Sequence, residues 1–225
     1  MNAIKAVFTK QMNDLPKNFA GMGLFIIWPI MAFAMGSVMG EAEANAAMFA
    51  AMLIGSGPMV SIANNVAEDN EYKSLRFLVM AGVKPWQYLV GLAGSVLLAS
   101  AVSLAALIWI GGFTGDVLIR LLIIAALGLV ASSILGGAVG IFAKNVQSAS
   151  ALSTPLMMIF AFTPLFAGFN ETVAHVAEFM FPYQVLMVVL NPYADFVRAL
   201  IVTGGSIVVL LAIFAVAYKK KGLRG

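Results

Sequence analysis

The chain has 225 residues, of which 62% are hydrophobic and 10% are charged, and its mean hydropathy is +0.98. Soluble domains are about half apolar and about a quarter charged, so this composition excludes an ordinary soluble protein and predicts an integral membrane protein. The formal net charge is +3, but most basic residues sit beside apolar runs, which argues against a nucleic-acid partner.

Residues 1–18 are predicted to form an amphipathic helix that lies in the headgroup plane of the membrane. Apolar residues recur at helical spacing opposite charged ones. The apolar set is Ile4, Val7, Phe8, Met12 and Leu15, and the charged set is Lys5, Lys10, Asp14 and Lys17. A full-length apolar run follows in place of the short run of a secretory signal, so the N-terminus is expected to stay on the protein.

Six apolar runs are each long enough to cross a bilayer, whose hydrocarbon core of roughly 30 Å takes about 20 residues of helix. They are residues 21–40, 46–67, 86–112, 117–143, 149–169 and 196–218. Pro29 predicts a kink in the first run, and small residues such as Gly136 and Gly140 in the fourth permit close helix packing. The sequence therefore predicts an all-α membrane protein in which residues 1–225 form a single transmembrane domain.

The distribution of basic residues predicts the orientation of these spans, because cytoplasmic loops carry the excess of Lys and Arg. The N-terminal segment, the loops after the second and fourth spans, and the C-terminal tail hold every Lys and Arg except Arg120 and Arg198. Both termini are therefore expected in the cytoplasm. The segment 170–195 lies on the opposite side, and it is too polar and too interrupted by proline to span cleanly.

The stretch 68–85, between the second and third spans, is predicted to form a short amphipathic helix in the cytoplasm. Acidic residues and Asn70 at its start suit a helix N-terminus, and Gly82 followed by Pro85 suits its end. An apolar face on such a helix favours a partner's groove. The alternative is that the helix lies on the membrane surface, which the acidic cluster disfavours because anionic lipid repels it.

This stretch also resembles part of a known family. An acidic start is followed by Ser74-Leu75-Arg76-Phe77-Leu78 and then by Ala81-Gly82-Val83-Lys84-Pro85-Trp86-Gln87-Tyr88-Leu89-Val90-Gly91. Further along, Gly168, Pro182 and Pro192 occur in the order that the family shows before its last span. Together with the N-terminal helix and the six spans, these features resemble the ABC-2 type transporter permeases, the membrane subunits of type V ABC exporters. Many relatives carry a large extracellular domain between the first two spans, and this chain has only a short connection there.

The resemblance implies that 68–85 is the coupling helix that docks on a separate ATP-binding subunit, and that 170–195 forms short re-entrant helices. The coupling residues would be Glu68, Glu71, Leu75, Arg76, Leu78, Val79 and Gly82. It also implies a second permease subunit, identical or related, with the second and fifth spans lining the path between the two. The candidates there are Ser61, Asn64, Asn65, Phe160, Thr163 and Phe166. Ordinary packing or lipid contact is the alternative for each of these residues. Asn64 and Asn65 are the strongest candidates, because an unpaired amide in hydrocarbon is costly.

The chain contains no Gly-x-x-x-x-Gly-Lys-Ser/Thr loop, so it is expected to be no enzyme and to bind no cofactor, with ATP and Mg held by the partner subunit. Acidic residues are expected only in loops, which argues against an ion-coupled carrier. The predicted function is an exporter subunit in a bacterial plasma membrane, surrounded by lipid. Methionine and aromatic residues in the spans favour a peptide or drug-like amphipathic cargo. The alternatives are a secondary carrier without an ATPase and the membrane subunit of an importer.

Overall fold

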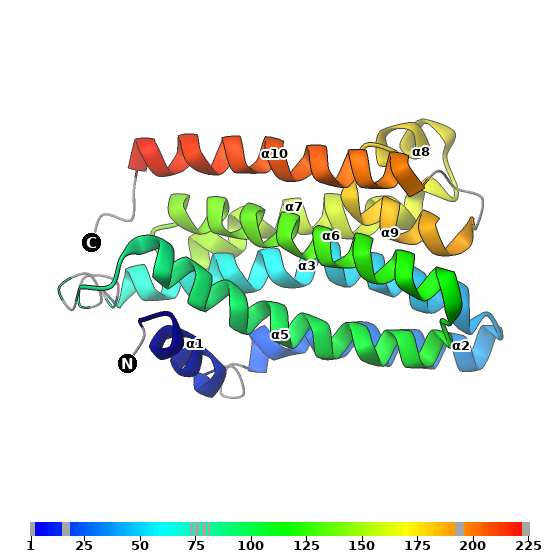
Figure 1. The fold of residues 1–225 in the computed structure, drawn as a ribbon, viewed down its shortest axis with the longest axis horizontal. Helices are drawn as coiled ribbons and strands as arrows, with labels where there is room; N and C mark the ends of the chain where they lie inside the picture. The colour runs from blue at the N-terminus through cyan, green and yellow to red at the C-terminus, as the bar shows by residue number, and fades with distance from the viewer. Residues whose placement is uncertain are drawn as a thin grey trace.

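The computed structural model is all-helical and describes residues 3–14, 19–72, 74, 77, 80, 82–191 and 196–221 (Figure 1). Within those residues the helices that have defined bounds are α1 (Ala3–Asp14), α2 (Phe19–Met39), α3 (Ala42–Glu71), α5 (Pro85–Gly111), α6 (Gly115–Phe142), α7 (Val146–Ala167), α8 (Glu171–Ala177), α9 (Phe181–Leu190) and α10 (Phe196–Lys221).

Six of these helices, α2, α3, α5, α6, α7 and α10, are long and apolar enough to cross a membrane. They correspond to the six predicted runs, so the all-α membrane class is confirmed. Between the last two spans, α8 and α9 form a pair bent by 107°. This pair occupies the segment that the sequence indicated was too polar and too rich in proline for a straight span.

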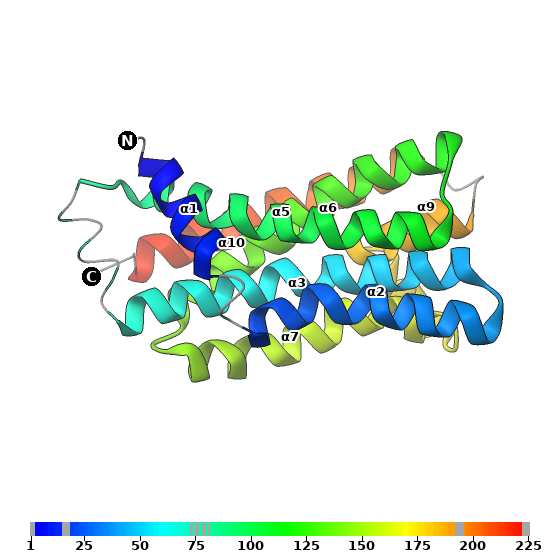
Figure 2. The same cartoon turned by 90° about the horizontal axis from the view of Figure 1, so that it is seen from below.

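Helix α3 is the central helix of the bundle. In its most apolar window 89% of the residues are buried, compared with 11% to 39% for the other five spans. It packs against α2, α5, α6, α7 and α9, and the two perpendicular views place it between its neighbours (Figures 1 and 2). The other spans therefore present most of their surface outward, and α3 is shielded by its own chain.

Small residues allow this central helix to be approached closely. A Cβ added at Gly136 of α6 would lie 2.5 Å from the carbonyl oxygen of Met59, and one at Gly140 would lie 2.7 Å from the Cβ of Val66. On the other side, a Cβ at Gly55 would lie 2.6 Å from the carbonyl oxygen of Phe160 in α7. Contacts between helices in lipid depend on such close approach. The packing predicted for the small residues of the fourth span is thus confirmed at Gly136 and Gly140.

Helix α1 lies oblique to the bundle, at the end where α3 finishes and α5 begins (Figure 2). This end is called the α1 end below, and the opposite one the α8 end. The predicted apolar face of α1 packs partly on protein. Val7 is buried, and a Cβ added at Gly91 of α5 would lie 2.8 Å from the Cβ of Val7. A Cβ added at Gly94 would lie 3.3 Å from the ring of Phe8. Two residues of the predicted helix, Leu15 and Lys17, lie outside the described residues.

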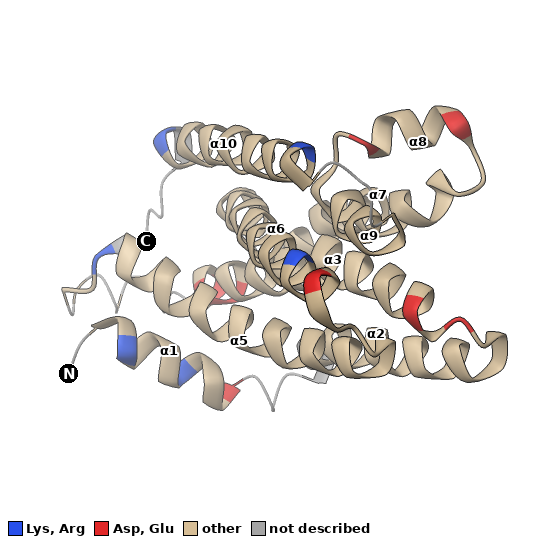
Figure 3. Ribbon diagram, turned by 45° about the vertical axis from the view of Figure 1, so that its right-hand side comes forward, with Lys and Arg blue, Asp and Glu red and all other residues tan. Residues whose placement is uncertain are grey.

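Charged residues gather at the two ends of the bundle (Figure 3). The basic residues described at the α1 end include Lys5, Lys10, Lys84, Lys144 and Lys219, whereas Arg120 and Arg198 lie at the α8 end. Acidic residues at the α8 end include Glu41, Glu43, Asp116, Glu171 and Glu178. This separation is the one on which the predicted orientation depends, and the side that faces the cytoplasm stays a prediction.

Candidate functional site at the α1 end of the bundle

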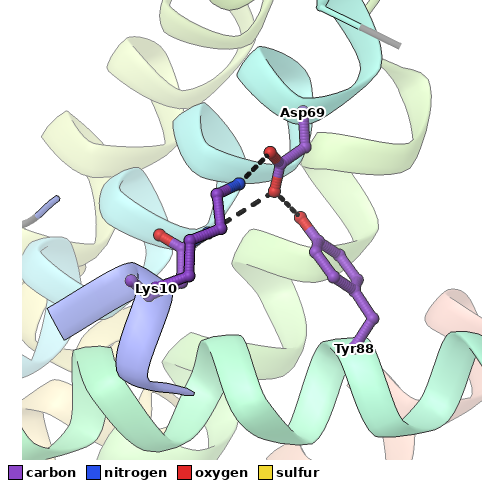
Figure 4. Close-up of polar contacts among 4 residues, drawn as sticks. Lys10, Asp69 and Tyr88 are labelled. Atoms are coloured by element: carbon purple, nitrogen blue, oxygen red, sulfur yellow. Dashed lines mark hydrogen bonds and ion pairs between the residues drawn. The ribbon is translucent and has the colours of Figure 1, made fainter. Parts of the chain in front are cut away.

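A buried carboxylate, that of Asp69, lies at the centre of the α1 end. Its residue is 4% exposed and lies in the last turns of α3. The Nζ of Lys10 in α1 lies 2.7 Å from Asp69 Oδ1, and the hydroxyl of Tyr88 in α5 donates to Oδ2 at 2.7 Å (Figure 4). Gln11 Nε2 donates to the same Oδ2 at 3.4 Å. One side chain therefore joins α1, α3 and α5.

The expectation that acidic residues occur only in loops is wrong at this position. The second span was predicted to end at residue 67, but α3 continues through Glu68 and Asp69 to Glu71. A helix of 30 residues is about 45 Å long, whereas the hydrocarbon core is roughly 30 Å thick. The polar last turns of α3 therefore extend past the apolar run, where an ionised side chain can meet basic and hydroxyl partners.

In the Asp69 cluster (Lys10, Gln11, Asp69 and Tyr88) the carboxylate is withdrawn from water, whereas its lysine partner is exposed. The Asp69 side chain is 6% exposed and that of Lys10 is 44% exposed. Removal of Lys10 would leave the buried carboxylate without its cation, at a cost below the roughly 3–5 kcal/mol typical of a pair in which both charges are buried. The cluster is therefore expected to hold α1 firmly on the bundle.

Glu71, the last residue of α3, contacts the start of α7. Its Oε2 accepts a hydrogen bond from the backbone N–H of Val146 at 3.1 Å. The first N–H groups of a helix lack intrahelical partners, and a negative charge is favourable there. Asn145 caps the same helix, since its Oδ1 accepts from Ser148 N at 2.8 Å. The end of the central helix is thus bonded to the beginning of the fifth span.

The loop between α3 and α5 displays apolar side chains at its surface. Tyr72, Phe77 and Met80 are 71%, 67% and 74% exposed, and Ser74, Phe77 and Met80 have helical backbone. The predicted coupling residues did not include these three. The only sequence signal for them was the presence of large side chains in a charged stretch.

Of the predicted coupling residues, Glu68 is half-buried in α3, Glu71 contacts α7, and Gly82 is exposed with a φ of +80°. A positive φ is what glycine tolerates at the end of a helix, in agreement with the stop predicted there. The remaining four predicted residues lie outside the described residues. They are Leu75, Arg76, Leu78 and Val79.

The predicted path residues lie in three different environments. Ser61 is buried within the bundle, and Phe160 is half-buried and stacks on Phe181 of α9 with ring centroids 5.3 Å apart. Phe166 is 54% exposed on α7. The three therefore share no single surface of one copy of the chain.

The polar path candidates have partners or partial exposure. Asn64 Oδ1 accepts from Ser150 Oγ at 3.3 Å, which bonds α3 to α7 near the α1 end. Asn65, beside it, is half-buried. Thr163 donates its hydroxyl to the backbone carbonyl of Ile159, so its polar atom is satisfied within α7. Asn64 is therefore the polar candidate that lies beside α7.

An aromatic and hydroxyl cluster joins the same two helices to α2. Trp28 Nε1 donates to Ser56 Oγ at 3.2 Å, and Ser56 donates to the carbonyl oxygen of Met52 at 2.6 Å. The Trp28 ring stacks on Phe49 at 6.1 Å and meets the edge of Phe162 at 6.5 Å. Nothing in this cluster is catalytic in character, and within the described residues no three His, Cys, Asp or Glu side chains group to hold a metal ion.

The fold and this junction define a multi-pass helical membrane protein with six candidate spans, of which the second is buried at the centre, and a bent helix pair before the last. A family model described as ABC-2 family transporter protein matches residues 32–217. The chain belongs to this family and is a membrane subunit of an ABC-2 family transporter. Membrane domains of the family typically lack ATPase activity. A comparison with curated proteins found no match.

Proposed function

We propose that this chain is the permease of an ATP-driven exporter, which moves an amphipathic or hydrophobic cargo with energy from a separate ATP-binding subunit. The observation that carries the proposal is the exposed apolar surface of Tyr72, Phe77 and Met80 between α3 and α5. An amphipathic helix at such a position is suited to a groove on a partner. The predicted coupling residues Leu75, Leu78 and Val79 lie outside the described residues, and the proposal keeps them as the predicted coupling face.

Force applied to this loop would reach the spans through the contacts at its base. Asp69 joins the end of α3 to α1 and α5, and Glu71 joins it to the N-terminus of α7. A displacement of the loop by the ATPase would therefore move α3 and α7 together. These are the two helices predicted to border the path, so the proposal links ATP binding to a change in access.

The path itself is proposed to form between two copies of this chain, or between this chain and a relative. Helix α7 supports this, because several of its large side chains point outward, among them Leu152, Met158, Ile159 and Phe166. Asn64 and Asn65 would supply amide groups beside that surface. With the α1 end in the cytoplasm, as the excess of Lys and Arg predicts, docking and ATP hydrolysis take place on the same side.

The direct test is to co-express the chain with a candidate ABC ATP-binding subunit and to replace Phe77 with aspartate. Because Phe77 is exposed, Phe77→Asp should leave folding intact while it abolishes co-purification of the ATPase and transport-coupled hydrolysis. Phe169→Asp, at a phenylalanine of the α8 end that is also exposed, is the matched control and should leave docking unchanged. Leu78→Asp tests the predicted face directly.

Retention of the ATPase and of transport in both Phe77→Asp and Leu78→Asp would contradict the docking assignment. Transport that persists when no ATPase is present would favour a secondary carrier. Uptake that depends on the ATPase would favour an importer. The three results test separate parts of the proposal: the docking surface, the dependence on ATP and the direction of transport.

A further inference from the structure

A groove of about 420 Å³ lies between α2 and α5, beside the end of α1. Specific pockets for small molecules have volumes of about 300–1,000 Å³, so its size is that of a binding site. Exposed side chains form its rim, including Ile26, Ile30 and Val102. Since α2 and α5 are membrane spans, the groove opens sideways into the hydrocarbon of the bilayer.

A proline and a serine determine the shape of the groove. Pro29 has no N–H, so the carbonyl oxygen of Phe25, one turn earlier, lacks its usual helical donor. Ser103 Oγ of α5 donates to that oxygen at 2.6 Å. On α5 the lining residues Ala99, Ser103 and Ala106 follow each other at helical spacing, so the wall facing α2 is built from small side chains.

This wall offers no free polar group to a ligand. The Ser103 hydroxyl is already bonded to Phe25, and the other lining residues are Met, Phe, Ile, Pro, Leu, Ala and Val. A polar head buried here would lose its hydrogen bonds with water and gain none, at a cost in free energy. The part of the ligand that enters the groove must therefore be hydrocarbon.

The length and direction of the groove match one acyl chain in one leaflet. Its lining runs from Met22 to Ile30 on α2 and from Leu98 to Ala106 on α5. At 1.5 Å per residue each stretch is about 12 Å long, close to the half-thickness of a hydrocarbon core of roughly 30 Å. The two helices both start at the α1 end, so the groove runs along the spans, as lipid chains do.

One end of the groove reaches α1, which carries an exposed lysine, Lys5, outside the Asp69 cluster. Met12 of α1 is part of the lining, and α1 also carries Lys5 and Lys10. Lys5 is exposed, and it precedes Met12 by two helical turns on the same face. Lysine side chains near a membrane surface attract anionic lipid.

We propose that this groove is a phospholipid site, which holds an acyl chain between α2 and α5 and an anionic headgroup beside the exposed side of α1. The lipid would lie between α1 and the first span, and would stabilise the angle that α2 makes with α5 at Pro29. The inference does not depend on the cargo or on the ATPase.

The experiment uses the full chain in nanodiscs made with phosphatidylglycerol, part of which carries a photoreactive diazirine in mid-chain. Crosslinked peptides are identified by mass spectrometry. We expect labelling concentrated at Met22–Ile30 and Leu98–Ala106. Uniform labelling of all outward helix faces, including α10, would overturn the proposal without the need for any variant.

Two neighbouring alanines of α5 provide a matched pair of variants. Ala106 lines the groove and Ala105 is exposed outside it. Ala106→Trp should reduce labelling of the groove at least fivefold, and Ala105→Trp should leave it unchanged. Ala99→Leu is a milder filling variant, in case the tryptophan lowers the folded yield. Equal labelling in Ala106→Trp, Ala99→Leu and Ala105→Trp would contradict the site.

The headgroup part is tested by repeating the labelling with diazirine phosphatidylcholine. Phosphatidylglycerol should label the groove several times more strongly, and Lys5→Glu should remove that preference. A preference that survives Lys5→Glu would overturn the role of α1. Displacement of the label by a transported compound would show that the groove belongs to the cargo and would overturn a resident lipid.

Discussion

The two ends of the bundle each contain an ion pair with an exposed basic partner, Lys10 or Arg198, but the acidic partner is buried in only one of the two pairs. At the α1 end the side chain of Asp69 is 6% exposed and has partners from α1 and α5. At the α8 end Glu178 and Arg198 pair across the bent helix segment and the start of α10, with side chains 38% and 56% exposed. A buried pair is costly to break, whereas an exposed pair typically contributes about 0–1 kcal/mol. The comparison predicts that removal of the acidic partner lowers stability more at the α1 end than at the α8 end.

This difference fits the role proposed for the α1 end. A loop that is pushed by a partner needs a firm base, and the Asp69 cluster with Glu71 supplies one. At the α8 end the polar bonds are local, such as those that Asn170 Oδ1 accepts from the N–H groups of Thr172 and Val173.

The largest expected effect is that of Asp69→Ala. It removes the acceptor of two side-chain bonds and leaves the buried hydroxyl of Tyr88 unsatisfied, so the free energy of unfolding should fall by more than the roughly 1.5–3 kcal/mol typical of one bond to a charged group. Steric trapping in lipid measures this change. Glu178→Ala is the matched control and should change the same quantity by no more than about 1 kcal/mol. Equal losses in the two variants would remove the distinction between the ends.

Tyr88→Phe should have the next largest effect. Tyr88 is fully buried and its hydroxyl bonds to a carboxylate, and such a bond is typically worth about 1.5–3 kcal/mol. The side-chain volume hardly changes, so no cavity is expected. In the Asp69→Ala background the same substitution should cost little, because the partner has already gone. Additive losses in this double-mutant cycle would show that Tyr88 acts through packing.

Glu71→Gln is expected to have a small effect on stability. The amide keeps an oxygen that can accept from Val146 N, but it loses the charge near the α7 N-terminus, which is typically worth about 0.3–1 kcal/mol. Measurement of unfolding and of ATPase co-purification on the same sample separates two roles for this residue. Loss of co-purification with unchanged stability would place Glu71 on the docking surface instead of at the base of the loop.

Arg198→Ala should have the smallest effect. The pair with Glu178 is exposed, so its contribution should be at most about 1 kcal/mol and should decrease further at high salt. Unfolding at low and high ionic strength gives both values. A loss as large as that of Asp69→Ala would contradict the difference predicted between the two ends.

The positions of the spans along the chain were predictable because each position depends on local composition. A run of about 20 apolar residues satisfies the bilayer wherever it occurs in the chain, so α2, α5, α6, α7 and α10 could be located without knowledge of their neighbours. The far end of α3 could not, since hydropathy falls at Asn64 and Asn65 while the helix continues to Glu71. Tertiary partners, and not local composition, make a helical Asp69 tolerable there.

The candidate site was predictable in location and only partly in its residues. The charged loop after the second span was identified from its pattern and its resemblance to the ABC-2 permeases. The contacts Lys10–Asp69, Tyr88–Asp69 and Glu71–Val146 join residues that are 59, 19 and 75 positions apart. No periodicity in a single segment carries information on such pairs.

The sequence by itself determined that this protein lies in the membrane, which six runs are long and apolar enough to cross it, where basic residues concentrate and which segment is interrupted by polar residues and proline. Those properties follow from the free energy of transferring each segment into lipid, which is nearly independent of the rest of the chain. Only the tertiary structure decided that α3 is the buried centre, that α1 is bonded to it through Asp69, and that Pro29 and Ser103 shape a groove beside α5. These depend on which surfaces meet, and in lipid that choice depends on close packing and hydrogen bonds between distant residues.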